Sequence, residues 1–536
     1  MSEGAGVEGA GVEGAAEGAA KGAAKGSIVQ GHEVEADLEL RCDVCVVGSG
    51  AGGSVLAGGL CEQGLDVVML EEGGYLTRRD FNLDEQRAYP ALYQDRGTRA
   101  TADLAITVLQ GRSVGGSTTV NWTTCWRTPA RILEHWERVH GIEGIDLETL
   151  RPHFEAVERR LSVQAWPVER INANNRALLD GCTALGWEAA PLRRNVKGCA
   201  DSGYCGVGCP VNGKQAMHLT YLPDAVVAGL RLYSDARATR IEVEGDRVKA
   251  VHAEVLDRAS GRPAGPKITV RPKVLVLSGG AINSPALLLR SGLTRDGKVG
   301  RRTFLHPVVV VGGVFDTPVQ ACFGAPQSIG SHQHIDRGVG RLGFFLETAP
   351  IQPVLGSFAT SLFGAQMAQF MGYLPNLAAP IALTVDGLLP GEEGGVVSLR
   401  KDGRIRLDYA LGEIHREAFK AAHQALARLL LAAGAREAVG FHHGLIRMAS
   451  EAELSRLDTA PYGALEHPIF SAHQMGGCTM GPDPATSVVG TDHRFHGLPN
   501  LFVVDGSVFP TALGVNPSES VYGFAHRARR FVGEAV

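Results

Sequence analysis

The 536-residue chain has no long hydrophobic run and no excess of basic residues. Because no stretch of about eighteen uninterrupted apolar residues occurs, no membrane-spanning helix is predicted. The formal net charge of -5 argues against a nucleic-acid binder, which typically carries a basic excess. Charged residues make up 20% of the chain and hydrophobic residues 44%, which is the composition of an ordinary globular enzyme long enough for more than one domain.

The N-terminal segment lacks what a folded or an exported segment needs. Residues 1–30 consist mostly of Gly, Ala and Glu, with no aromatic residue and no apolar run. Such a composition cannot bury enough surface to offset its ordering entropy, so we predict a disordered tail over residues 1–38. The segment has neither a continuous apolar h-region nor paired arginines. We therefore predict a cytoplasmic protein, in which cysteines are thiols or metal ligands rather than disulfides.

A glycine-rich turn between two short apolar strands is the first motif that carries chemistry. An apolar run leads into "GSGAGG" at residues 48–53, a small-residue helix follows, and a second apolar run ends at Glu71. Gly48 would form the tight turn, Gly50 would let the backbone approach a pyrophosphate, and Gly53 would let helix and strand pack closely. Glu71 stands where a carboxylate binds a ribose hydroxyl. The order of these parts predicts a dinucleotide site, and the alternative is a purely structural glycine turn.

Three further segments resemble the signatures of one enzyme family. They are "GRSVGGSTTVNW" at residues 111–122, "LSGGAINSPALLLRSGL" at residues 277–293, and the C-terminal run that starts with "HQMGGCTM" at residue 473. Together with the glycine turn, they resemble the glucose-methanol-choline (GMC) oxidoreductase family in their order along the chain. The resemblance implies an α/β fold, with a discontinuous Rossmann-like FAD-binding domain and a substrate domain built on an antiparallel sheet.

The resemblance also implies where the cofactor lies. We expect an FAD-binding domain over residues 39–300 and 467–536, with a substrate-binding domain over residues 301–466 between its two parts. Val120 stands where some family members attach the flavin to a histidine, so FAD is expected to be bound non-covalently. For Asp505, a cap of a helix or turn is an equal alternative to a cofactor contact. Besides the glycine turn and Glu71, the expected FAD contacts are Gly115, Gly116, Ser117, Asn121, Asp505 and Gly506.

Oxidation of an alcohol by a flavin requires one group that takes the hydroxyl proton and another that orients the alcohol for hydride transfer. Carried over from the family, these groups are His473 in "SAHQMGG" and Asn516 in "LGVNPSES". Histidine suits the first role because its unperturbed pKa lies near neutrality. The amide of Asn516 would hold the hydroxyl oxygen and stabilise a developing alkoxide. By spacing alone, His473 is better explained as a hydrogen-bonded scaffold residue, and the family resemblance reverses that preference.

Three of the ten cysteines lie in one short glycine-rich segment, "CADSGYCGVGCPVNGK", which we call the cysteine segment (residues 199–214). Cys199, Cys205 and Cys209 follow the spacing of a bacterial ferredoxin run, except at one position where serine replaces cysteine. The pattern predicts an iron–sulfur cluster held by three thiolates. The alternatives are a zinc site completed by His218 and a metal-free loop with reduced cysteines.

Within the family, the cysteine segment is similar to segments of two groups of enzymes. These are the FAD subunits of bacterial sugar dehydrogenases, which hold a three-iron cluster there, and the long-chain fatty alcohol oxidases. The run that follows the segment also resembles the fatty alcohol oxidases. We therefore expect oxidation of a hydrophobic alcohol, long-chain or sterol, with oxygen, a quinone or a redox protein as electron acceptor. The alternatives are a sugar or polyol dehydrogenase that passes electrons through a cluster to a partner, and a non-redox lyase that contains flavin.

Overall fold

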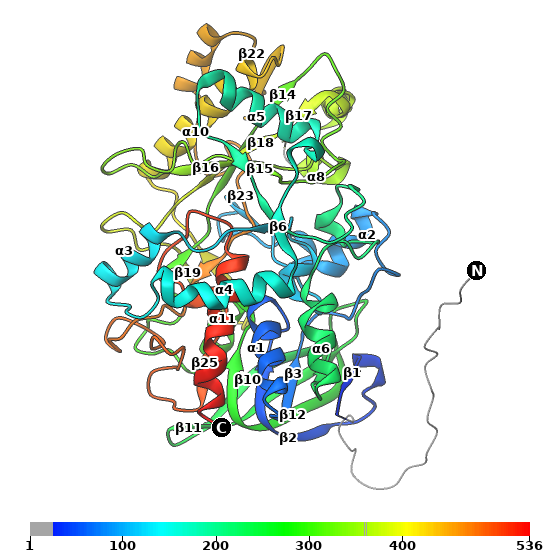
Figure 1. Cartoon of the computed structure of the whole chain (residues 1–536), viewed down its shortest axis with the longest axis vertical. Helices are drawn as coiled ribbons and strands as arrows, with labels where there is room; N and C mark the ends of the chain where they lie inside the picture. Colours follow the sequence, from blue (N-terminus) through cyan, green and yellow to red (C-terminus); the bar gives the residue numbers. More distant parts are fainter. Residues whose placement is uncertain (1–24, 359, 361) are drawn as a thin grey trace, which may run out of the picture.

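Two eight-stranded sheets organise the chain, one in the lower and one in the upper half of the view in Figure 1. The computed structural model describes residues 25–536 apart from residues 359 and 361. The lower sheet joins segments from both ends of the chain, whereas the upper sheet takes most of its strands from the middle. Both sheets contribute walls to a single large cavity.

The lower sheet contains the predicted Rossmann-like core. Its parallel strands, from one edge inward, are β1 (Ser27–Val29), β9 (Arg231–Tyr233), β3 (Val67–Leu70), β2 (Leu38–Val47), β12 (Pro263–Leu277) and β25 (Leu501–Val503). Strand β12 also pairs antiparallel with β11 (Arg247–Leu256), which pairs in turn with β10 (Ala236–Glu244). The carboxyl ends of β2, β12 and β25 therefore meet at one edge, where ligands bind in open α/β sheets.

Helices from distant parts of the chain cover the lower sheet (Figure 1). Helix α1 (Ala51–Glu62) follows the glycine turn, and ten of its twelve residues are buried because small side chains let it lie close to its neighbours. It packs against α11 (Ser518–Gly533) and α6 (Tyr221–Val227), and α11 packs against α4 (Leu147–Arg160). The predicted order of strand, glycine turn, helix and strand is confirmed.

The upper sheet is centred on β14 (Val308–Val314), all of whose residues are buried. Its strands are β16 (Phe344–Thr348), β18 (Pro380–Thr384), β14, β21 (Glu437–Gly440) and β22 (Ile446–Met448), with β17 (Leu377–Ala378), β23 (Phe470–Ser471) and β4 (Thr107–Val108) attached. All pairs are antiparallel except that of β23 with β4. Helices α10 (Glu413–Ala432) and α5 (Ala173–Leu185) pack against this sheet. The predicted fold class is confirmed. The upper sheet is antiparallel except for the parallel pair of β23 with β4.

Shorter elements connect the two large sheets. The short strands are β5 (Thr124–Cys125), β6 (Val163–Ala165), β7 (Ala190–Pro191), β8 (Arg193–Asn195), β13 (Thr303–Phe304), β15 (Ile329–Gly330), β19 (Val396–Leu399), β20 (Ile405–Asp408) and β24 (Met475–Gly476). The other α-helices are α2 (Glu85–Leu92), α3 (Ala130–His140), α7 (Gly280–Arg290), α8 (Pro353–Phe358) and α9 (Gly364–Tyr373). Helix α7 falls within the predicted signature segment 277–293.

The predicted disordered tail is only partly open to comparison, because residues 1–24 lie outside the described residues. For residues 27–38 the prediction is wrong: β1 pairs with β9 at the edge of the lower sheet, and Ile28 lies opposite Leu232. A three-residue strand is too short for a composition argument to detect. The predicted domain boundaries stay a prediction.

Within residues 25–536, leaving aside positions 359 and 361, no helix is long and apolar enough to cross a membrane. The cytoplasmic location stays a prediction.

Candidate active site

A cavity of about 750 Å³ extends from the glycine turn after β2 to strands of the upper sheet. At one end its walls include the glycine turn, the ends of β3 and β12, and part of β10. At the other end they include residues of β14, β18 and β23 together with His473 and Asn516. One continuous space thus joins the predicted cofactor site to the predicted catalytic pair.

The glycine turn is shaped by contacts that no larger residue would allow. Gly48 has a φ of +103°, and a Cβ there would lie 2.3 Å from the Ser278 carbonyl oxygen. A Cβ on Gly53 would lie 2.0 Å from the carbonyl oxygen of Gly48. Gly50 differs, because a Cβ there would meet only the Cα of Gly116, at 3.8 Å, and would otherwise project into the cavity. Gly48 and Gly53 are therefore required by the protein itself, and Gly50 leaves room for a ligand.

Sequence reasoning missed one glycine of this turn. A Cβ on Gly52 would lie 1.9 Å from the carbonyl oxygen of Val504, at the end of β25. Gly52 and Val504 are far apart in the sequence, so the local motif indicates this contact only through the extra glycine. Gly52 lets the start of α1 approach the C-terminal segment.

Glu71 lies at the end of β3, buried beside the turn. Its Oε2 accepts hydrogen bonds from the backbone N–H and the hydroxyl of Ser49, at 2.9 and 2.7 Å, and its Oε1 accepts one from the Gly73 N–H at 2.8 Å. Burial raises the pKa of this carboxyl above its ordinary value. Glu71 also lines the cavity, so it braces the turn and stands at the predicted ribose position.

A second glycine loop, residues 115–121, holds further predicted flavin contacts and lies against the glycine turn of residues 48–53. Gly115 and Gly116 have φ values of +98° and +55°, and a Cβ on Gly116 would lie 2.6 Å from the Cα of Gly50. The Ser117 hydroxyl accepts a hydrogen bond from the Gly111 N–H at 2.9 Å. The buried amide oxygen of Asn121, which also lines the cavity, has no hydrogen-bond partner among the described residues. A glycine-walled cavity with an unpartnered amide oxygen fits an FAD molecule.

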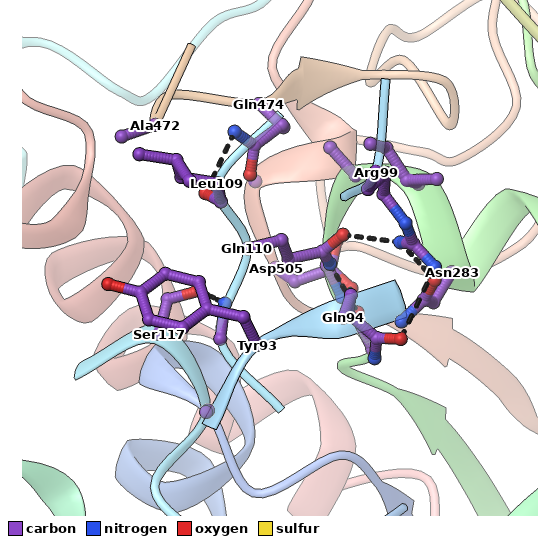
Figure 2. A pocket seen from close by; sticks show the side chains of 18 of the residues that line it. Tyr93, Gln94, Arg99, Leu109, Gln110, Ser117, Asn283, Ala472, Gln474 and Asp505 are labelled. Carbon is purple, nitrogen blue, oxygen red and sulfur yellow. Dashed lines mark hydrogen bonds between the residues drawn. The ribbon is translucent and has the colours of Figure 1, made fainter. Parts of the chain in front are cut away.

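Asp505 fulfils the capping alternative. Its Oδ1 accepts from the backbone N–H of Ser507, and its Oδ2 accepts from the Gly280 N–H and the Ser284 hydroxyl at 2.8 and 2.6 Å. It therefore ties the turn after β25 to the start of α7. Asp505 and Gly506 also line the cavity, and Asp505 stands beside Gln110 in Figure 2.

A buried arginine forms a polar cluster in the cavity wall that sequence reasoning missed (Figure 2). Nη1 of Arg99 donates to the side-chain oxygens of Gln110 and Asn283 at 2.6 and 2.9 Å, and Nη2 donates to Gln94 at 3.2 Å. Nε of Arg99 pairs with Asp95 at 2.7 Å. The cluster fixes side chains from three separate segments around the cavity, and no motif links them in the sequence.

The structure brings the predicted catalytic pair together. Nε2 of His473 lies 3.4 Å from Nδ2 of Asn516, and both residues line the cavity. Burial lowers the pKa of His473 to about 3, so its imidazole is neutral at pH 7 and carries a proton on only one ring nitrogen. The side-chain oxygen of Asn516 is buried without a partner among the described residues. The side chains of His473 and Asn516 thus lie together at the same end of the cavity.

Two further residues orient the pair and were missed. Nδ1 of His306 lies 3.1 Å from Nδ1 of His473, and Nε2 of His306 accepts a hydrogen bond from the Gly514 N–H at 3.1 Å. That bond places the ring proton of His306 on Nδ1, facing Nδ1 of His473. With this contact made, a neutral His473 carries its own proton on Nε2, and it can accept a proton there only when the contact to His306 is exchanged. Oε2 of Glu347 accepts a hydrogen bond from the Asn516 amide at 3.2 Å. The one available sequence signal for Glu347 was a carboxylate that directly follows the apolar run Phe344–Leu346 of β16.

Comparison with known proteins identifies the family. Two family models described as GMC oxidoreductase match residues 89–308 and 390–525. The chain belongs to the GMC oxidoreductase family. This membership confirms the resemblance seen in the sequence and makes the chain an FAD-dependent oxidoreductase. The roles of individual site residues stay predictions.

Relatives of this GMC oxidoreductase include an uncharacterised GMC-type oxidoreductase of Mycobacterium tuberculosis, 35% identical over 90% of this chain and 75% of the relative. A long-chain-alcohol oxidase of Arabidopsis thaliana is 31% identical, over 91% of this chain and 68% of the relative. Among solved structures, pyridoxine 4-oxidase from Mesorbium loti matches with a TM-score of 0.66 at 20% identity, over 91% of this chain and 98% of that chain. A formate oxidase variant from Aspergillus oryzae matches with a TM-score of 0.65 at 15% identity, over 92% and 98%. Both structures share the fold.

The cysteine segment of this GMC oxidoreductase is not gathered into a ligand set. In the part of the chain that the structure describes, no group of three or more His, Cys, Asp or Glu side chains is arranged to hold a metal ion. Sγ of Cys199 points to Asp201 at 3.6 Å, and Nδ1 of His218 lies 3.5 Å from the Thr119 hydroxyl. The ferredoxin-like spacing therefore does not by itself bring Cys199, Cys205 and Cys209 together. The iron–sulfur cluster stays a prediction.

Replacing Glu347 by Gln is expected to make the enzyme more stable at alkaline pH. Burial raises the pKa of Glu347 to about 8, whereas in an unfolded chain it is about 4.3. The folded state binds the extra proton between these values, so the stability that Glu347 contributes is present below about pH 4 and is lost as the pH rises toward 8. Glu347→Gln removes that loss and keeps an oxygen for the Asn516 amide.

Urea denaturation of wild type and Glu347→Gln at pH 5.5 and pH 8 measures this effect. The free energy of unfolding of the variant, relative to wild type, should be higher at pH 8 than at pH 5.5. A relative stability that is the same at both pH values would contradict a raised pKa. Glu417→Gln is a matched control, because that carboxylate pairs with Arg337 and is 41% exposed.

Proposed function

We propose that this enzyme oxidises a hydrophobic alcohol, long-chain or sterol, to an aldehyde or ketone with FAD as the oxidant. The observation that carries the proposal is the placement of His473 and Asn516 together at the apolar end of the cavity. FAD, when bound, supplies the acceptor for a hydride from the carbon that bears the hydroxyl. Side chains of the protein would accept the proton and position the alcohol.

His473 takes or shares the proton of the alcohol, and Asn516 holds the hydroxyl oxygen. The neutral imidazole supports the role of His473, and the Nδ2 amide group of Asn516, 3.4 Å from Nε2 of His473, is the donor that can bind the hydroxyl oxygen. Glu347 positions Asn516 by accepting from its amide, and His306 positions the imidazole of His473. These four side chains would thus hold the hydroxyl oxygen of the alcohol and orient the carbon that bears it. Hydride transfer needs such an orientation.

The cofactor would lie along the remaining cavity wall. Gly50 leaves room for the pyrophosphate, Glu71 stands near the ribose, and the second glycine loop with Asn121 offers backbone and amide groups to the flavin. The C-terminal segment would add Asp505 and Gly506. The rest of this expected set is Gly48, Gly53, Gly115, Gly116 and Ser117.

The wall near the catalytic pair favours an apolar substrate. It includes Val308, Ile381, Leu383 and Phe470, from strands of the upper sheet, beside the amide side chain of Gln327. A sugar or polyol would need several hydrogen-bonding side chains there. The similarity to long-chain-alcohol oxidases of Arabidopsis thaliana supports the same choice, and it supports oxygen over a quinone or a redox protein as electron acceptor.

The experiment that tests the function is an anaerobic absorption spectrum of the purified FAD enzyme, before and after addition of dodecan-1-ol. Bleaching of the flavin bands by dodecan-1-ol, but not by glucose, is expected. Bleaching by glucose alone would support the sugar dehydrogenase, and no bleaching by dodecan-1-ol, cholesterol or glucose would support the lyase. Broad absorbance that remains after bleaching, together with protein-bound iron, would support the cluster at Cys199, Cys205 and Cys209.

A further inference from the structure

The cysteine segment places a buried lysine against the loop that lines the cavity. We call residues 115–122 the cavity loop, because most of them line the cavity. Lys214, the last residue of the cysteine segment, is 2% exposed. Its Nζ donates to the backbone carbonyl oxygens of Thr119, Asn121 and Cys205, each at 2.7 Å. Lys214 does not itself line the cavity, so its ammonium group holds the cavity loop from behind.

A second buried cation contacts the same loop. Arg194, on β8, has no exposed surface. Its Nη2 donates to the backbone oxygen of Trp122 at 3.3 Å and lies 4.0 Å from Sγ of Cys205. Its guanidinium lies over the ring of Trp166, at 4.7 Å from the ring centre, and Nε and Nη1 have no hydrogen-bond partner among the described residues. Two positive charges therefore bind three carbonyl groups of the cavity loop.

No carboxylate balances these charges within the described residues, because the groups that Lys214 and Arg194 bind are carbonyl oxygens. The other titratable side chains that face Lys214 are Cys205 and Cys209, and also His218, whose pKa burial lowers to about 4. Burial of an unpaired charge is costly, and it lowers the pKa of Lys214 to about 8, which still leaves the ammonium form in the majority at pH 7. Because Lys214 and Arg194 have no carboxylate partner, both cations would stabilise a negative charge that forms nearby.

We propose that Lys214 and Arg194 stabilise the negative charge that FAD gains on reduction, and so raise its reduction potential. The inference rests on the proposed function, in which the carbon–hydrogen bond of the alcohol gives FAD a hydride and the hydroxyl proton passes to His473. FAD that has received a hydride would carry an added negative charge, and charges act over longer distances in the protein interior than in water. The cations also offset the negative ends of the carbonyl dipoles that they bind on the cavity loop.

The reduction potential of bound FAD is the quantity to measure, by anaerobic titration with dithionite and a reference dye. Lys214→Met removes the charge and keeps the length of the side chain, Lys214→Arg keeps the charge, and Lys273→Met removes a lysine charge that is 61% exposed. We expect Lys214→Met to shift the two-electron equilibrium about tenfold toward oxidised FAD, which corresponds to about 30 mV. Lys214→Arg and Lys273→Met should stay within threefold of wild type.

An unchanged potential in Lys214→Met that still binds FAD would overturn the proposal and leave Lys214 a purely structural role or a thiolate as its partner. Should Lys214→Met fail to fold, Arg194→Met is expected to give the same shift. Should neither variant hold FAD, the wild-type potential decides: a value above that of free FAD supports the proposal, and one at or below it overturns it. Because dithionite replaces the alcohol, the result is separate from whether an alcohol is the substrate.

Discussion

His473→Ala and His473→Asn are expected to slow the reduction of FAD by an alcohol by about 10²- to 10⁴-fold, the usual contribution of a positioned general base. The imidazole of His473 is neutral, lines the cavity, and lies within 3.4 Å of Asn516. Neither alanine nor asparagine accepts a proton at neutral pH. Anaerobic stopped-flow reduction with a saturating alcohol measures the rate directly.

The two substitutions separate a base from a hydrogen-bond donor. Asparagine can still donate to the alcohol oxygen, as an imidazole with its proton on Nε2 would, so an Asn variant that keeps most of the wild-type rate would contradict the assignment as base. His496→Asn is the matched control. His496 belongs to the same C-terminal segment and bonds to the Ser487 hydroxyl at 2.8 Å, but it does not line the cavity.

Gly52→Ala and Gly50→Ala are expected to fail for different reasons, although the two glycines are two residues apart. A Cβ on Gly52 would lie 1.9 Å from the Val504 carbonyl oxygen, so this substitution should lower the free energy of unfolding by at least about 1–3 kcal/mol, as overpacking does. A Cβ on Gly50 meets only the Cα of Gly116, at 3.8 Å, and projects into space that the pyrophosphate would fill. Gly50→Ala should keep the stability of the apoprotein and lose FAD.

Urea denaturation of the apoproteins, together with the FAD content of the purified variants, tests both expectations. Gly50→Ala with normal FAD content would show that the pyrophosphate lies elsewhere. Gly52→Ala with wild-type stability would show that α1 and the C-terminal segment can move apart without cost. Gly372→Ala is the control, because a Cβ on that helical glycine would meet nothing within 4 Å.

Motifs within one short segment could be interpreted from the sequence, because their geometry is local. The glycine turn can be recognised from Gly48, Gly50 and Gly53 in order, and the structure forms it as predicted. Contacts across the chain could not be inferred in the same way. His306 lies 167 residues before His473, and Glu347 lies 169 residues before Asn516. Their roles depend on how two sheets meet, which no local pattern specifies.

Three other expectations show the same boundary between local and distant information. The cysteine spacing is local, but the structure does not bring Cys199, Cys205 and Cys209 together. Strand β1 forms by pairing with the outer edge of β9, whereas its own three residues give little indication of a strand. For Asp505 the sequence allows a cap or a cofactor contact, and the residue both ties the turn after β25 to the start of α7 and lines the cavity.

The place of β12 in the lower sheet has a consequence for how the protein emerges from the ribosome. β12 (Pro263–Leu277) needs β2, from the first tenth of the chain, on one side and β25 (Leu501–Val503), from the last tenth, beside it on the other. Residues 278–500 are therefore synthesised while Leu275–Leu277 still lack their partner on that side, where β11 pairs only with the earlier part of β12. The nascent chain must keep that apolar edge from pairing with other chains during translation, and the cofactor site is among the last parts of the molecule to be completed.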